Sequence, residues 1–170
     1  YFEDADLEKA VKISADACFI TNGQSCDAAS RFLVQRKVYD HVVEMVAEQV
    51  RSVKVGDPMV EGKHIGPVVN KNQFENIQKL IEIGINEGAN LKVGGLGLPA
   101  GLNKGYYIRP TLFADVNNEM NIAQNEVFGP VLSIIPFDTE DEAIEIANQT
   151  PYGLAAYIQS TNKQRIDRVS

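Results

Sequence analysis

The stretch Val131-Leu132-Ser133-Ile134-Ile135-Pro136-Phe137 is almost wholly apolar, and after Asp138 it is followed by Thr139-Glu140-Asp141-Glu142. An apolar run of this length is typical of a strand that is covered on both faces of its sheet. Thr139 and Glu142 have the spacing of a capping box, which predicts a helix from there through Ala147. A strand of this kind that leads into a helix is typical of an α/β protein.

The same alternation extends along the whole chain. Apolar residues at helical spacing predict helices over residues 4–17, 38–53 and 71–87. Short extended patterns predict strands over residues 31–35, 89–93, 108–116 and 154–158, and a further helix begins before the last residue. The sequence therefore predicts one domain, residues 1–170, with a layered α/β/α fold and a mostly parallel sheet.

Some segments allow finer predictions. The inward stripe of helix 71–87 is expected to be Phe74, Ile77, Ile81 and Ile85. Gly88 is expected to cap this helix at its C-terminus. Pro110 interrupts strand 108–116, which predicts a sheet edge or a bulge there. Residues 94–105 are expected to form a loop, because they lack a full GxGxxG motif and no helix follows them.

Bulk composition excludes several classes of protein. The net charge of −7 argues against a general attraction to nucleic acid. No apolar run reaches the length of a membrane span, and no signal peptide is visible. Two cysteines make no disulfide framework, and the two histidines, His41 and His64, lie in no zinc-site pattern. We therefore expect a cytoplasmic protein that binds neither membrane nor metal.

Cys26 ends the stretch Gly23-Gln24-Ser25-Cys26. A cysteine that follows a glycine turn at the start of a short helix would meet free backbone N–H groups and a helix dipole, both of which favour the thiolate. The same N–H groups could stabilise an oxyanion, although the neighbouring Asp27 opposes thiolate formation. The alternative is a buried cysteine that only packs, which is the interpretation we favour for Cys18 in its apolar helix.

A second candidate site lies in Asn125-Glu126-Val127-Phe128-Gly129-Pro130. On an extended segment Glu126 and Phe128 would point the same way, so that they could hold a sugar hydroxyl and an adjacent flat ring. The alternative places Glu126 in solvent, Phe128 in the core and Gly129-Pro130 in a turn.

Together these stretches resemble the aldehyde dehydrogenases. Gly23-Gln24-Ser25-Cys26 is similar to the family's Gly-Gln-x-Cys nucleophile motif, and residues 126–131 resemble its Glu-Ile-Phe-Gly-Pro-Val signature. The opening Phe2-Glu3-Asp4-Ala5-Asp6-Leu7 resembles the stretch past the family's Glu-Leu-Gly-Gly-Lys segment. Smaller pieces occur in family order: Val55-Gly56-Asp57-Pro58, Gly66-Pro67, Gly88-Ala89, Arg109-Pro110-Thr111, Ala147-Asn148 and Tyr152-Gly153-Leu154-Ala155.

The resemblance implies that residues 1–170 are the cysteine-bearing catalytic domain of a longer enzyme. Cys26 would attack an aldehyde to give a thiohemiacetal, hydride would pass to NAD or NADP, and water would hydrolyse the resulting thioester to the acid. The backbone N–H of Cys26 would form part of the oxyanion hole. Glu126 and Phe128 would hold the nicotinamide ribose and pack near the nicotinamide.

By the same resemblance, the general-base glutamate, the oxyanion-hole asparagine and most of the dinucleotide-binding domain would precede Tyr1. The oligomerisation strand of a homodimer or homotetramer would lie outside residues 1–170. We therefore expect the isolated chain to be inactive. Thr21 and Asn125 stand where family members usually have an asparagine and an acid, and an asparagine follows one place later at Asn22.

Two other classes of function compete with this interpretation. One is a cysteine hydrolase or acyl-transfer enzyme that uses Cys26 without a nicotinamide cofactor and needs a nearby base. The other is a non-catalytic α/β scaffold or oligomerisation module in which Cys26 is inert.

Overall fold

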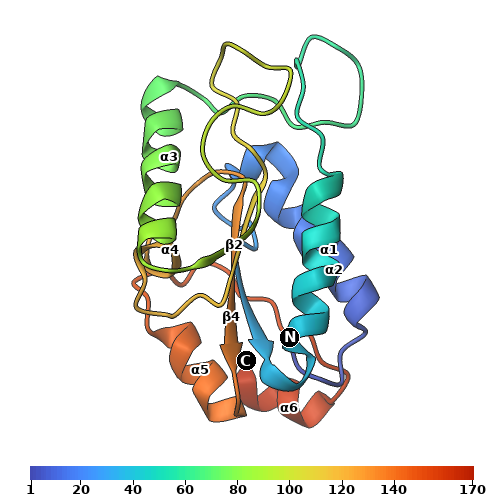
Figure 1. The fold of residues 1–170 in the computed structure, drawn as a ribbon. Helices are drawn as coiled ribbons and strands as arrows, with labels where there is room; N and C mark the ends of the chain where they lie inside the picture. The colour runs from blue at the N-terminus through green and yellow to red at the C-terminus, as the bar shows by residue number, and fades with distance from the viewer.

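A four-stranded sheet of order β1-β4-β3-β2 lies at the centre of the computed structural model, which describes residues 1–170 (Figure 1). β4, Val131–Phe137, is an inner strand. Both of its neighbours, β1, Arg31–Gln35, and β3, Thr111–Ala114, pair with it in parallel. β2, Asn90–Val93, runs antiparallel to β3 at one edge. The predicted mostly parallel sheet is confirmed.

Helices cover both faces of this sheet (Figure 1). One face carries α1, Leu7–Phe19, and α2, Tyr39–Ser52. The other carries α3, Lys71–Asn86, the short α4, Asn121–Gln124, and α5, Glu140–Asn148. Three further elements are the 3-10 turns η1, Ile20–Gly23, and η2, Arg36–Val38, and the last helix α6, Lys163–Val169. The predicted α/β/α layering is therefore correct.

β4 contributes to two separate hydrophobic cores. Ile135 and Phe137 pack with α3, α4 and α5 in what we call the α3 core. Leu132 and Ile134 point the opposite way and pack with α1 and α2 in the α2 core. Successive side chains of a strand face opposite sides of the sheet, so a strand between two helix layers must be apolar at nearly every position. This explains the nearly continuous apolar run from Val131 to Phe137, which only Ser133 interrupts.

The helix ends follow the local signals in the sequence. The Thr139 side chain accepts a hydrogen bond from the Glu142 N–H (3.2 Å), and the Glu142 carboxylate accepts from the Asp138 N–H (2.7 Å). These paired bonds form a capping box whose return bond falls one residue earlier than usual. At the far end of α3, Gly88 adopts φ +90°, a left-handed conformation typical of the residue that follows a helix.

The predicted inward stripe of α3 is wrong at its last position. Ile77 and Ile81 are buried as expected, but Ile85 is 37% exposed. Gly84 takes the core position instead, because Ile122 of α4 packs so closely that a β-carbon on Gly84 would lie 3.3 Å from it. The close approach of α4 therefore moves the contact face of the helix away from Ile85.

The edge expected at Pro110 is also wrong. β3 begins one residue after Pro110 and is an inner strand, paired on both sides. The missing N–H of Pro110 therefore lies outside the ladder, where no donor is needed. An irregularity in pairing does occur between β2 and β3, but it falls between Leu91 and Val93 on the partner strand.

The strand predicted over residues 154–158 is not formed. Leu154 and Tyr157 are 71% and 57% exposed, and the only backbone hydrogen bond of residues 153–159 joins the Phe2 N–H to the Gln159 carbonyl (3.1 Å). A strand needs a hydrogen-bonded neighbour in its ladder, and no strand of this chain pairs with the segment. An apolar pattern in the sequence does not specify whether a neighbouring strand is available for pairing.

No helix in the structure combines the length and apolarity that crossing a bilayer would require.

The fold predicts different effects for the same substitution at two positions of α3. We expect Ile81→Ala to lower the free energy of unfolding by about 2–5 kcal/mol, because it opens a cavity in the α3 core. Ile85→Ala removes the same atoms from a half-exposed position and should cost less than about 1 kcal/mol. Urea unfolding of the full-length protein measures both, and equal losses would contradict the assigned packing face.

Candidate active site

The two candidate loops lie at the same end of the sheet, at the amino ends of its strands, because β1 and β4 are parallel neighbours. Residues 23–30 lead into β1 and residues 126–130 lead into β4. β1 and β4 are adjacent and parallel, with Arg31 opposite Ser133 and Gln35 opposite Phe137. Segments that precede adjacent parallel strands must meet at the amino ends of those strands. Two stretches a hundred residues apart in sequence are brought together in this way.

Their backbones touch at Gly23. This residue has φ +66°, and a β-carbon added to it would lie 2.2 Å from the carbonyl oxygen of Gly129. Gly129 is itself packed against α3, since a β-carbon there would lie 2.5 Å from Cδ1 of Ile77. Only glycine allows two backbones to approach so closely. Gly23 therefore allows the two loops to touch, and Gly129 allows its own loop to pack against α3.

The turn before Cys26 has an uncommon backbone conformation. Thr21, Asn22 and Gly23 all have positive φ, at 56°, 60° and 66°. Left-handed geometry is uncommon for an ordinary residue and especially so for a β-branched one such as Thr21. Two side-chain contacts hold the turn: the Asn22 amide donates to the Pro67 carbonyl (2.9 Å), and Gln24 accepts from the Val69 N–H (3.1 Å).

Cys26 lies in a turn that is closed by a hydrogen bond from the Ala28 N–H to the Ser25 carbonyl (3.1 Å). No helix begins there, so the helix dipole expected from the sequence is absent. The thiol is exposed, which excludes the alternative of a buried packing cysteine. The backbone N–H of Cys26 donates to no group within the chain and is free to bind an oxyanion. The neighbouring Asp27 accepts a hydrogen bond from the Ser25 hydroxyl.

Cys18 has the opposite environment. It is fully buried on α1 within the α2 core, and its sulfur lies 4.0 Å from the Val131 carbonyl oxygen. Burial raises the pKa of the Cys18 thiol to about 12 because the low-dielectric core disfavours the thiolate. The interpretation of Cys18 as a packing residue is consistent with this environment.

Glu126 and Phe128 do not lie on one extended segment as predicted. Phe128 has a left-handed backbone with φ +53°, and its ring is 37% exposed rather than buried in the core. The Glu126 carboxylate is exposed, whereas Val127 between them is buried. Neither the extended geometry nor the core position expected for Phe128 is therefore formed.

A cavity of about 620 Å³ lies beside the loops and contains both Cys26 and Glu126 in its wall. Phe128 is outside this wall. From the loops the cavity extends along β1 beneath residues 153–159. The structure therefore brings two of the three candidate residues to one hollow.

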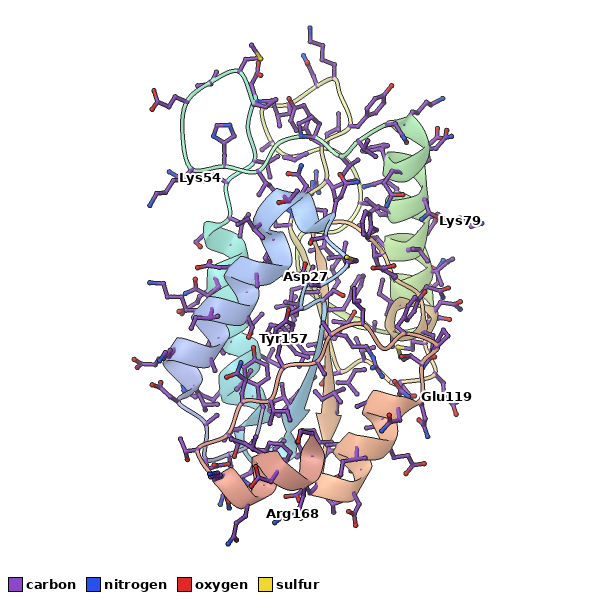
Figure 2. The ribbon with its side chains drawn as sticks, turned by 180° about the vertical axis from the view of Figure 1, so that it is seen from behind. Asp27, Lys54, Lys79, Glu119, Tyr157 and Arg168 are labelled. Atoms are coloured by element: carbon purple, nitrogen blue, oxygen red, sulfur yellow. The ribbon has the colours of Figure 1, made fainter.

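Two tyrosines for which the sequence suggested no role connect residues 152–157 to the loops. The Tyr152 hydroxyl accepts from the Glu126 N–H (3.1 Å), and the Tyr157 hydroxyl donates to the Asp27 carbonyl (3.0 Å). Figure 2 labels Asp27 and Tyr157 near the middle of the molecule. Tyr152 just before the apolar run 154–158 and Tyr157 within it were a visible signal, but their partners are distant in sequence.

Comparison with known proteins decides the family. The profile of the aldehyde dehydrogenase family matches residues 1–170. The chain belongs to the aldehyde dehydrogenase family. A putative aldehyde dehydrogenase of Staphylococcus aureus is 44% identical over 168 residues, which are 99% of this chain and 35% of the relative. This aldehyde dehydrogenase chain therefore spans about a third of the length of the curated relatives it matches.

Solved structures agree. The crystal structure of an aldehyde dehydrogenase from Bartonella henselae is 48% identical with a TM-score of 0.96, over 99% of this chain and 35% of that one. Aldehyde dehydrogenase C of Pseudomonas syringae, solved as a Cys-to-Ala mutant with NAD+ and octanal, is 42% identical with a TM-score of 0.95, over 98% and 34%. At these identities the fold of this aldehyde dehydrogenase chain is that of its relatives.

The contact between the loops predicts a severe effect of Gly23→Ala. The substitution adds a clash with the Gly129 carbonyl to the strain of positive φ, so we expect a loss of about 2–5 kcal/mol of stability. Gly101→Ala is the matched control, since Gly101 has φ +82° with nothing within 4 Å, and it should cost only about 1 kcal/mol. Thermal unfolding of the full-length protein compares them; similar losses would argue against the contact.

The cysteines should differ in reactivity. At pH 8 we expect iodoacetamide to modify Cys26 in the folded protein at least about 100-fold faster than Cys18, whose burial both raises its pKa and blocks access. In 8 M urea (roughly the concentration needed to unfold most domains) the difference should disappear. Peptide mass spectrometry gives both rates, and rapid labelling of Cys18 in the folded state would refute its placement.

Proposed function

We propose that the full-length protein oxidises an aldehyde to a carboxylic acid with NAD or NADP, and that residues 1–170 are its cysteine-bearing catalytic domain. The observation that carries the proposal is the shared cavity, whose wall contains both the exposed Cys26 and Glu126. Relatives support the reaction class: the Pseudomonas syringae enzyme was solved with NAD+ and octanal, and a Bacillus cereus enzyme with NAD+.

In this proposal Cys26 is the nucleophile. Its thiolate sulfur attacks the aldehyde carbon, a carbon–sulfur bond forms, and the carbonyl electron pair moves onto oxygen. The free N–H of Cys26 is adjacent to the sulfur and would donate to that oxyanion. The contact between Gly23 and Gly129 and the tethers of Asn22 and Gln24 hold this loop in one geometry before substrate arrives.

The residues of the second loop fit a nicotinamide nucleotide. The exposed Glu126 carboxylate can accept hydrogen bonds from ribose hydroxyls, and the outward ring of Phe128 offers an apolar face to a flat heterocycle. When bound, NAD or NADP supplies the two-electron acceptor that converts an aldehyde to the oxidation level of an acid. The role of Glu126 and Phe128 is to hold that group beside the cavity that contains Cys26.

A cysteine hydrolase is the weaker candidate. Such an enzyme needs a base near its nucleophile, and neither histidine lines the cavity of Cys26. His64 contacts the Asp57 carbonyl (2.9 Å) in a separate loop. Since the chain spans about a third of its relatives, we propose that the water-activating base and most of the dinucleotide-binding surface come from the rest of the protein. The isolated chain should then show no sustained turnover, and a homodimer or homotetramer remains a prediction.

Substituting each cysteine by alanine in the full-length protein tests the proposal. Cys26→Ala should lower the kcat for aldehyde oxidation by at least about 10³-fold while NADH still binds, because only the nucleophile is lost. Cys18→Ala makes the same chemical change in the core and should leave kcat within about threefold, with about 1 kcal/mol less stability. Steady-state kinetics with octanal as probe measures both. Retention of activity by Cys26→Ala would refute the nucleophile assignment.

A further inference from the structure

The loop of Glu126 and Phe128 is held by one side chain of α3. The Gln73 amide nitrogen, Nε2, donates to the carbonyl of Val127 (3.0 Å) and to the carbonyl of Phe128 (2.9 Å). No other side chain donates to the carbonyls of residues 126–130. An amide nitrogen carries two hydrogens, so both are used on two successive peptide groups. This arrangement fixes the orientation of the peptide planes on either side of Phe128.

That segment needs an external restraint. Phe128 is the one residue of the loop with a left-handed backbone, which a side chain larger than glycine adopts infrequently. Phe128 at this bend is 37% exposed, and Glu126 two residues before it is exposed as well. Such conformations persist where surrounding contacts determine them, and they cluster at functional sites. If the peptide planes relaxed, the ring and the carboxylate would lose their fixed relation to each other.

Gln73 is well placed to act as that restraint. It lies in the first turn of α3, and its own N–H is capped by the Asn70 side chain (2.9 Å). Four residues later Ile77 is fully buried and touches Gly129, so the helix is anchored against the same loop. Just before α3, Pro67 and Val69 hold the Cys26 loop through Asn22 and Gln24. Residues 67–73, which lead into and begin α3, therefore contact both loops of the candidate active site.

We propose that Gln73 is a positioning residue that fixes Glu126 and Phe128 in the geometry that binds the nicotinamide nucleotide. It acts through the carbonyls of Val127 and Phe128. The inference rests on the proposed function, because it takes Glu126 and Phe128 to be cofactor-binding residues. A neutral donor is required at this position, since a carboxylate of the same shape would face two carbonyl oxygens and could not donate to either.

The test compares Gln73→Glu and Gln73→Met with Gln78→Glu in the full-length protein. Gln78 lies on the same helix, but its side-chain oxygen accepts from the Gly97 N–H (2.7 Å) and its nitrogen has no partner, so glutamate keeps its hydrogen bond. The Kd for NADH by fluorescence titration is the main measurement. We expect it to rise about tenfold in Gln73→Met and further in Gln73→Glu, and to change less than about twofold in Gln78→Glu.

Other readouts separate positioning from general damage. Gln73→Met should raise the KM for the cofactor with kcat nearly unchanged, and it should leave the alkylation rate of Cys26 as in the unmodified protein. Parallel loss of cofactor affinity, Cys26 reactivity and thermal stability in both Gln73 variants would overturn the inference in favour of a structural role. Unchanged NADH affinity in Gln73→Met would overturn it as well.

Glu126→Gln and Phe128→Ala distinguish failure of the inference from failure of the proposed function. If these two variants weaken NADH binding while the Gln73 variants do not, Gln73 is no positioning residue and the cofactor assignment stands. If neither Glu126→Gln nor Phe128→Ala affects NADH binding, the cofactor assignment fails, and the inference about Gln73 fails with it. Weakened binding in all four, with Gln78→Glu unaffected, supports both.

Discussion

Parallel pairing of β1 with β4 is the interaction on which both the fold and the candidate active site depend. β4 is apolar on both faces because helices cover the sheet on each side, and its burial in both cores stabilises the sheet. The strand that pairs with it in parallel brings its preceding loop to the same sheet edge. Cys26 and Glu126 therefore line the same cavity because two buried strands are neighbours, although each lies on an exposed loop.

The site combines a rigid support with several uncommon backbone conformations. Thr21, Asn22 and Phe128 all adopt positive φ, and each such residue costs on the order of 1–3 kcal/mol. Hydrogen bonds with residues 67–73, the segment that leads into α3, hold both turns. Asn22 and Gln24 of the first turn bond to the backbone of this segment, and the Gln73 side chain of the segment bonds to the carbonyls beside Phe128. The α3 core thus supplies the stability that allows the loops to keep geometries they would not adopt alone.

The two cysteines show how position changes the chemistry of one functional group. Cys18 is enclosed by the α2 core, where burial holds its pKa near 12 and keeps it a thiol at neutral pH. Cys26 is exposed in a turn with a free backbone N–H and a shared cavity. Because no helix starts at Cys26, the free N–H and the restrained loop are the features that support its proposed role, and the helix dipole contributes nothing.

The sequence by itself determined the elements and their layering, because periodic burial and capping are encoded locally. Strand 31–35 and the helix after Thr139 follow from such patterns, and the two glycine motifs indicated the residues of the candidate site. Only the tertiary structure decided which of these segments pair or pack with a neighbouring element. Residues 154–158 form no strand because no strand pairs with them. Gly84, and not Ile85, occupies the core position of α3 that faces α4. Phe128 is exposed at a bend whose carbonyl accepts a hydrogen bond from Gln73. Each of these outcomes depends on contacts between residues far apart in the chain, which no local pattern specifies.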